Sequence, residues 1–185
     1  MMIRIVDILK KSTKGEIKLI GQNLDGKSVE NMRYNLEFTK GEVIKIDFVR
    51  DIFSLIRPAK LLNGIYVLSV EDIYLRKIYA VSGLRTNNDE IGRAKFVGGR
   101  QDAKDLFDIY YLSNEFMKLS VFVAKFCNQT LKEGVIRWFR TFPRKEMKEK
   151  LADHIKTDKV IEFKDIDKHL ADEVDKILER EIDLQ

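Results

Sequence analysis

The sequence predicts an α+β fold in which the strands come first and the helices follow. Two runs alternate apolar and polar residues, MRYNLEF at residues 32–38 and VIKIDFV at residues 43–49, as the strands of a hairpin do. Beyond residue 69 the apolar residues recur at helical spacing instead. We therefore expect a strand-rich part over residues 1–68 and a helical part over residues 69–185, packed together as one compact unit.

The strand-rich part also contains shorter elements. Residues 2–12 are compatible with a short amphipathic helix or with a strand that leads into a helix, and residues 16–20 with a strand. Lys40 and Gly41 mark the turn between the two alternating runs. A further short strand is expected over residues 65–68.

The helical part begins with a capping signal. Ser69, followed three residues later by Asp72, predicts a helix that runs to about residue 82. A connection rich in glycine and polar residues follows over residues 83–99, and a second helix starts near Asp102. The remaining helices are expected at about residues 118–130, 131–140, 144–155 and 165–183.

The composition excludes a transmembrane protein and a disulfide-rich protein. The chain has 185 residues, 44% of them hydrophobic, which is enough to bury a core, and no apolar run is long enough for a transmembrane helix. The N-terminus does not have the pattern of a signal peptide, so we expect a cytoplasmic protein. A single cysteine, Cys127, excludes a disulfide framework. His154 and His169 are expected to be exposed.

The charges are unevenly distributed. The net charge is +4. Residues 118–150 carry nine bases and three acids, whereas residues 151–185 carry six bases and eleven acids. A basic middle suits RNA or nucleotide phosphates, and the alternative is that the acidic tail pairs with the middle. An aromatic and basic cluster around Trp138 allows base stacking, although core packing is the favoured interpretation.

Four side chains are candidates for chemistry. Lys77 has mostly apolar neighbours one helical turn away, so its ammonium must either extend to solvent or meet an anion. Asp105 and Asp108 are three residues apart and share a helix face, where they either serve a site or complement the helix dipole. Asp47 projects from the mixed face of its strand. A single carboxylate is fewer than magnesium normally requires.

Two of these segments resemble a known family. The run VLSVEDIYLRKIYAVSG, followed by GGRQDAKDLFDIYYL, resembles the AbiEii-type toxin nucleotidyltransferases of type IV toxin–antitoxin systems. The lysine of the first motif corresponds to Lys77. The two acids of the second correspond to Asp105 and Asp108, with Arg100 before them. Upstream, KIDF resembles the strand with the third carboxylate, Asp47. The resemblance covers residues 31–112.

The resemblance implies a polymerase-β-like sheet, here in truncated form, followed by a helical C-terminal bundle. It also implies transfer of a nucleotide from a nucleoside triphosphate, with Mg²⁺, to tRNA, another RNA or a protein. An antitoxin is an implied partner. The implied catalytic residues are Asp47, Lys77, Asp105 and Asp108, with Lys77, Arg100 and Lys104 binding the nucleotide and Asp47 the metal.

The sequence departs from the family pattern at one point. It contains no Gly-Gly-Ser/Thr turn and no Asp-x-Asp pair ahead of Asp47, and its one Asp-x-Asp, at Asp165 and Asp167, lies in the acidic tail. We expect one of three explanations: a truncated start, a separate chain that supplies the first motif, or loss of metal catalysis. The last leaves a non-catalytic module that binds RNA or protein.

Overall fold

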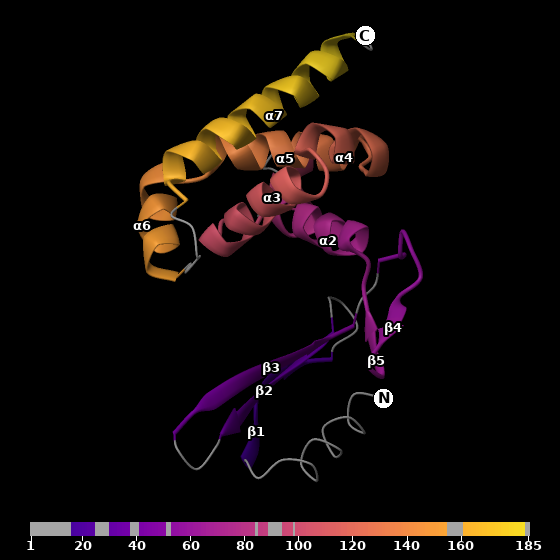
Figure 1. Ribbon diagram of the computed structural model, residues 1–185, viewed down its shortest axis with the longest axis vertical. Helices are drawn as coiled ribbons and strands as arrows, with labels where there is room; N and C mark the ends of the chain where they lie inside the picture. Colours follow the sequence, from indigo (N-terminus) through magenta and orange to yellow (C-terminus); the bar gives the residue numbers. More distant parts are fainter. Residues whose placement is uncertain are drawn as a thin grey trace. The chain divides into compact units, whose positions relative to one another are not determined.

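The computed structural model describes residues 16–24, 30–37, 41–50, 53–83, 85–88, 94–97, 99–154 and 161–183. A small antiparallel sheet precedes a helical region, which confirms the α+β class (Figure 1). The helix or strand expected over residues 2–12 lies outside the described residues. No helix in the described ranges has both the length and the apolar composition needed to cross a membrane.

By its internal contacts the chain divides into two compact units, Met1–Ser54 and Leu55–Gln185. The first unit contains the strands β1 (Glu16–Asn23), β2 (Asn31–Glu37) and β3 (Val43–Val49). The second begins with the short strands β4 (Lys60–Leu62) and β5 (Ile65–Val67). This hairpin thus groups with the helices, whereas the sequence analysis divided the chain after residue 68.

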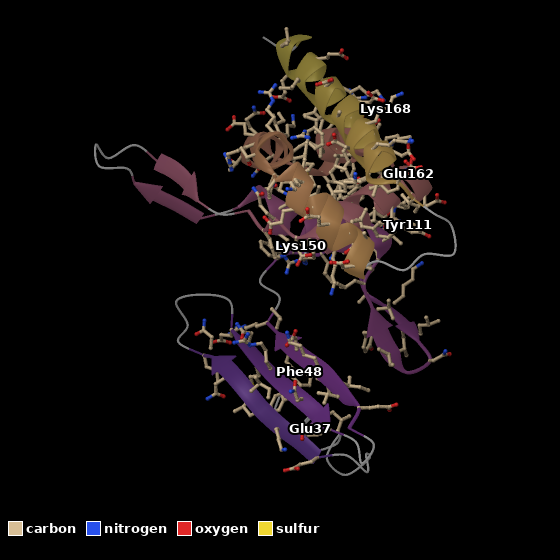
Figure 2. The ribbon with its side chains drawn as sticks, turned by 90° about the vertical axis from the view of Figure 1, so that its left-hand side faces the viewer. Glu37, Phe48, Tyr111, Lys150, Glu162 and Lys168 are labelled. Carbon is tan, nitrogen blue, oxygen red and sulfur yellow. The ribbon has the colours of Figure 1, made fainter. Side chains whose placement is uncertain are left out.

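The sheet of the first unit has the order β1-β2-β3, with both pairs antiparallel. The expected hairpin of two alternating runs is therefore confirmed as β2 and β3. Alternation gives the sheet two different faces, because Met32 and Tyr34 are buried while Arg33 between them is exposed. Tyr34 meets Phe48 of β3 edge-on, with ring centroids 5.9 Å apart. Phe48 is labelled on the sheet in Figure 2.

The hairpin β4–β5 turns at Asn63 and Gly64, whose φ angles of 50° and 81° suit a two-residue hairpin loop. Only its second strand was expected. The connection after α2 contains a second missed hairpin, β6 (Arg85–Asn88) paired with β7 (Ala94–Val97). These strands are three or four residues long, too short for alternation to stand out from a loop.

The helices agree closely with expectation. They are α2 (Val70–Ser82), α3 (Ala103–Glu115), α4 (Leu119–Phe126), α5 (Gln129–Thr141), α6 (Arg144–His154) and α7 (Phe163–Asp183). Helix α7 packs against α3, α4 and α5, and α2 packs against α3 and α5 (Figure 1). Gly134 allows α5 to approach α2 closely, because a Cβ at this position would lie only 2.5 Å from the Cβ of Ser82.

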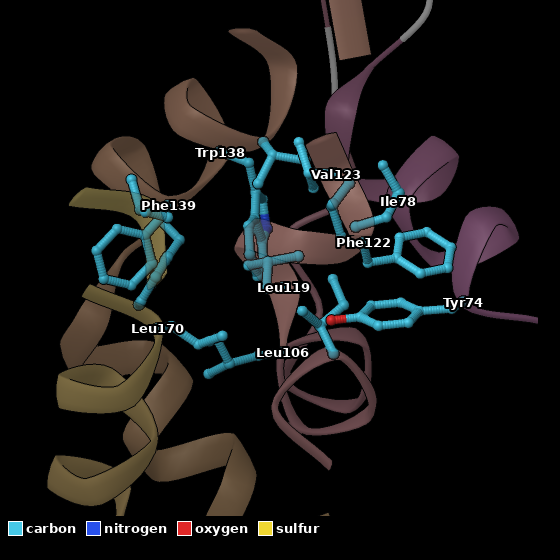
Figure 3. Packing of buried hydrophobic residues seen from close by; sticks show 14 of the residues in the cluster. Tyr74, Ile78, Leu106, Leu119, Phe122, Val123, Trp138, Phe139 and Leu170 are labelled. Atoms are coloured by element: carbon cyan, nitrogen blue, oxygen red, sulfur yellow. The ribbon is translucent and has the colours of Figure 1, made fainter. Parts of the chain in front are cut away.

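All six helices in the described part of the chain contribute to one hydrophobic core. Tyr74 of α2 stacks on Phe122 of α4, with ring centroids 4.1 Å apart (Figure 3). Trp138 and Phe139 are buried in the same cluster, so the core-packing interpretation of the aromatic segment is confirmed. Arg144 lies over the ring of Phe139 at 5.1 Å, which leaves this ring packed rather than open to a base.

Buried polar groups join α4 to its neighbours. Lys118, at the start of α4, provides no side-chain cap. Instead Glu173 of α7 accepts hydrogen bonds from the Ser120 N–H at 3.0 Å and the Ser120 hydroxyl at 2.8 Å. His169 is half-buried and lies 2.8 Å from the Ser113 hydroxyl, so the expectation that it is exposed was wrong. The helix spacing alone could not show that α7 packs on α3 here.

Candidate functional site

Helix α2 carries Lys77 at the border of the core. The helix begins at Ser69, whose hydroxyl accepts a hydrogen bond from the Asp72 N–H at 3.1 Å, as the capping signal predicted. One turn on either side of Lys77, Tyr74 and Val81 are fully buried. The Lys77 side chain is 27% exposed. A lysine in this position needs an anionic partner for its ammonium.

Helix α3 supplies two such partners. The Lys77 Nζ lies 3.0 Å from Asp105 Oδ1 and 2.5 Å from Asp108 Oδ2. The spacing of three residues places both carboxylates on one face of α3, and that face meets α2. The structure therefore brings together three residues that the sequence analysis singled out from two separate helices.

Arg100 completes the cluster from the segment just before α3. Its Nε and one terminal nitrogen donate to the two oxygens of Asp105, at 2.6 and 2.9 Å. The Arg100 backbone N–H donates to the Ala80 carbonyl at 2.8 Å, which attaches this segment to the end of α2. Gly99 permits the close approach, because a Cβ there would lie 1.8 Å from the Val81 oxygen.

The two carboxylates differ in their surroundings. The Asp105 side chain is 2% exposed and accepts hydrogen bonds from both Lys77 and Arg100. The Asp108 side chain is 40% exposed and contacts Lys77 from the solvent side. Both oxygens of Asp105 thus accept hydrogen bonds, and the carboxylate holds two cations. Asp108 is the more solvent-accessible of the two partners of Lys77.

Lys77 keeps its positive charge in this setting. Burial tends to lower the pKa of its ammonium, but the hydrogen bonds to Asp108 and Asp105 raise that pKa by more, so the net shift is upward. The group is therefore protonated at neutral pH and cannot act as a base. It can bind an anion such as a phosphate as a compact point charge.

A comparison with protein families now bears on these residues. The family model for the nucleotidyl transferase AbiEii toxin of type IV toxin–antitoxin systems matches residues 8–180. The chain belongs to the AbiEii family. A search of curated proteins and a search of solved structures each found no match. The match extends beyond the motifs noted above and takes in the helices α4 to α6 and most of α7.

Membership of the AbiEii family supports the description of this chain as a nucleotidyltransferase-like toxin. The type IV toxin–antitoxin assignment also implies an antitoxin counterpart and a nucleoside triphosphate substrate. The cluster of Lys77, Asp105, Asp108 and Arg100 falls within the matched range. The roles of the individual residues remain predictions.

Asp47 of this AbiEii chain belongs to the first unit, on β3, whereas the Lys77 cluster belongs to the second. Its side chain is 46% exposed, and its carboxylate lies 3.8 Å from the Lys45 ammonium. It lines a shallow pocket together with Gln22, Asn23, Asn31, Arg33 and Val49. Asp47 is therefore solvent-accessible on a polar surface of the first unit.

The AbiEii family generally implies Mg²⁺, so we asked whether the described residues suit this ion. The magnesium ions of nucleotide transfer are normally bound by two or more carboxylates together with phosphate oxygens and water. Asp47 contributes one carboxylate, with Lys45 beside it and Arg33 lining the same pocket. Within the described ranges no three acidic, histidine or cysteine side chains gather to hold a metal. These residues by themselves do not form a magnesium site.

Lys104 is exposed in the first turn of α3. Its backbone N–H donates to the Asp102 carboxylate at 2.9 Å, which makes Asp102 the cap of the helix. Asp102 thus has the capping role that acids near a helix start commonly have. The proposed contact of Lys104 with a nucleotide remains a prediction.

Sequence reasoning assigned too small a role to Asp72. Besides its place in the capping box, its carboxylate accepts hydrogen bonds from the Ile56 N–H at 2.7 Å, the Arg57 N–H at 3.2 Å and the Ser69 hydroxyl at 2.5 Å. The side chain is completely buried. Asp72 therefore attaches the segment before β4 to the helix that carries Lys77. An acid in a helix's first turn gives no signal of such a distant contact.

Proposed function

We propose that this AbiEii-family chain transfers a nucleotide from a nucleoside triphosphate to an RNA acceptor, with tRNA as the first candidate and a protein as the alternative. The observation that carries the proposal is the Lys77 ammonium, held between a buried and an exposed carboxylate on the neighbouring helix. Family membership supports the reaction class. Because both triphosphates and tRNA are cytoplasmic, we place the reaction in the cytoplasm.

In this proposal Lys77 binds the phosphates of the substrate. The ammonium is already charged and partly exposed, so a triphosphate oxygen need only replace the Asp108 carboxylate beside it. Asp105 and Arg100 hold the lysine side chain in place while this exchange occurs. The released Asp108 carboxylate is then available to accept a proton from the attacking hydroxyl, whose oxygen bonds to the α-phosphorus while pyrophosphate leaves.

The substrate in this proposal is the magnesium complex of the triphosphate. When magnesium is bound to the triphosphate, it offsets the negative charge of the phosphate oxygens. For Asp47, on the first unit, the family resemblance implies a role in metal binding, which the Asp47→Ala variant below tests. Lys104 and Arg100 are the further cations that we assign to the nucleotide; Lys104 is exposed in the first turn of α3, and Arg100 pairs with Asp105.

The proposal is tested by transfer of label from each of the four α-³²P nucleoside triphosphates to bulk tRNA, with magnesium present. We expect labelled tRNA with the unchanged chain and with one preferred nucleotide. Lys77→Ala should lower the rate by about a hundredfold or more, because a donor aimed at developing charge is lost. Asp47→Ala should abolish transfer.

Two control variants accompany these substitutions. Lys150 forms an exposed ion pair with Glu146, and Asp167 forms one with Arg144, so Lys150→Ala and Asp167→Ala should leave transfer unchanged. If folded protein transfers no label to tRNA or to added protein, the enzyme proposal fails. Salt-sensitive tRNA binding that persists in Asp47→Ala would then favour the non-catalytic binding module.

A further inference from the structure

A pocket of about 290 Å³ lies between α4, α5 and α7 of the helical unit. None of the residues that line it belongs to the Lys77 cluster, which is carried by α2, α3 and the segment before α3. Spaces between the helices of a bundle are frequent sites for small ligands. This pocket is therefore a second candidate site, separate from the one described above.

The walls of this pocket are mostly apolar. Val123 of α4 and Ile177 of α7 belong to the buried core, and Ala124 of α4 is exposed where it lines the pocket. Hydrocarbon groups of a ligand gain free energy when such a surface removes them from water. The walls thus favour a ligand with an apolar part.

Three charged side chains line the same pocket, and two of them neutralise each other. Lys132 of α5 pairs with Glu181 of α7 at 2.7 Å, and their side chains are only 17% and 21% exposed. The third, Arg180 of α7, donates from one terminal nitrogen to the Ser120 carbonyl at 2.9 Å. In the described part of the chain no carboxylate pairs with Arg180. The pocket therefore has one positive charge that is not neutralised.

The contact of Arg180 with a neutral carbonyl positions the guanidinium without neutralising it. It uses one terminal nitrogen, which leaves the Nε–H and the second terminal nitrogen as donors. These two groups form the planar fork that binds a carboxylate through two parallel hydrogen bonds. Arg180 can thus bind the acidic group of a ligand while it remains attached to α4.

These features together fit an anion that has a single charge and a hydrocarbon chain. A polyphosphate fits poorly, because apolar walls give its oxygens no hydrogen bonds and Glu181 repels additional negative charge. We propose that the pocket binds an aliphatic monocarboxylate, with its chain against Val123, Ala124 and Ile177 and its carboxylate on Arg180. This inference goes beyond the proposed function and does not depend on it.

The test is equilibrium binding of octanoate to the full chain, measured by titration calorimetry. We expect saturable binding at one site at millimolar concentration or below. Acetate has the charge without the chain, and 1-octanol has the chain without the charge. Each should bind at least about tenfold more weakly than octanoate, because each lacks one of the two contacts.

Three variants test the residues that line the pocket. Arg180→Ala should weaken octanoate binding about tenfold or more, because charge-assisted hydrogen bonds are lost. Arg180→Lys should recover only part of the affinity, since an ammonium does not form the paired contact. Ala124→Leu should block binding while every charge is kept, because its added carbons occupy the space of the ligand. Ala124 is exposed, so the longer side chain does not enter the core.

Arg140 provides the matched control. Like Arg180 it is an exposed arginine in the last turn of a helix of the same unit, but it does not line the pocket. Arg140→Ala should therefore bind octanoate as the unchanged chain does. Circular dichroism confirms that each variant is folded. Octanoate should also raise the unfolding temperature of the unchanged chain but not that of Ala124→Leu, since a ligand stabilises only the state that binds it.

Each of the other outcomes contradicts a part of the inference. Absence of saturable octanoate binding by the unchanged chain would overturn the site. Equal affinities for octanoate and 1-octanol, or equal octanoate binding by folded Arg180→Ala, would overturn the assignment of Arg180 to the carboxylate. Undiminished binding by Ala124→Leu would show that octanoate binds elsewhere. Label transfer to tRNA is a separate measurement, so the proposed function stands or fails independently of these results.

Discussion

Asp105 and Asp108 are three residues apart on one helix and contact the same lysine, yet only Asp105 is withdrawn from solvent. A buried carboxylate that holds two cations loses much more when it is neutralised than an exposed one does. We therefore assign the two acids different roles. In the proposed function, Asp105 maintains the geometry of the cluster, and Asp108 exchanges with the substrate.

This division of roles predicts unequal effects on stability. Asp105→Asn should lower the free energy of unfolding by about 2 kcal/mol, because Lys77 and Arg100 lose their shared partner in a poorly solvated position. Asp108→Asn should lower it by less than about 1 kcal/mol, because water replaces the exposed contact. Urea unfolding followed by circular dichroism measures both values. Equal losses in the two variants would contradict the assignment.

At the scale of residues, spacing predicted which side chains share a face but not how deeply each is buried. The interval between Asp105 and Asp108, and the apolar neighbours of Lys77, were enough to select the cluster. The burial of Asp105 depends on the packing of α2 against α3, and the place of Arg100 depends on a backbone contact with Ala80. Neither contact leaves a pattern in the sequence.

At the scale of elements, Asp72 links two segments that are separate in the chain. Burial tends to raise the pKa of its carboxyl, but hydrogen bonds from the Ser69 hydroxyl and the Ile56 and Arg57 N–H groups lower that pKa by more. The net shift is downward. The ionised form therefore stabilises the folded chain at all pH values above the carboxyl's ordinary pKa.

The expected pH dependence follows from this direction. As pH falls from about 5 toward 3, Asp72 is protonated in the unfolded chain before it is protonated in the folded chain. The free energy of unfolding therefore decreases over this range. Asp72→Asn should be less stable at neutral pH and should show a shallower loss across this range. Urea unfolding at a series of pH values provides the measurement. An unchanged slope in Asp72→Asn would show that the contact does not stabilise the fold.

The elements themselves differed in how well they could be predicted. Helices α2 and α3 were found within a residue or two, because a capping residue and a long apolar stripe mark each of them. Helices α4 and α5 were expected a few residues too long or too late, since the break after Phe126 has no proline or glycine. The hairpin β6–β7 was missed because its first strand reads RTNN, a polar run typical of loops.

At the scale of the whole molecule, the helical core is self-contained. Every residue of the larger hydrophobic cluster lies between Ile56 and Leu178, inside the second unit. The lysine and both helical carboxylates of the candidate site belong to the same unit. The chain therefore combines a scaffold that supports Lys77 with a separate sheet that presents Asp47 and Arg33.

This arrangement predicts that residues 55–185 fold without the first unit. The fragment should keep its helical circular dichroism and unfold cooperatively within about 5 °C of the helical transition of the full chain, because no core contact is lost. Trp138, the one tryptophan, is buried in this core and reports its unfolding by fluorescence. A gradual transition, or exposure of Trp138 at room temperature, would contradict the prediction.

The C-terminal end of α4 carries a buried thiol that can report on opening of the structure. Cys127 is the one cysteine of the chain, and burial raises the pKa of its thiol to about 12. A thiol that is covered and protonated does not react with alkylating reagents. The rate of alkylation at Cys127 therefore reports how often the end of α4 opens, and no cysteine has to be introduced for this measurement.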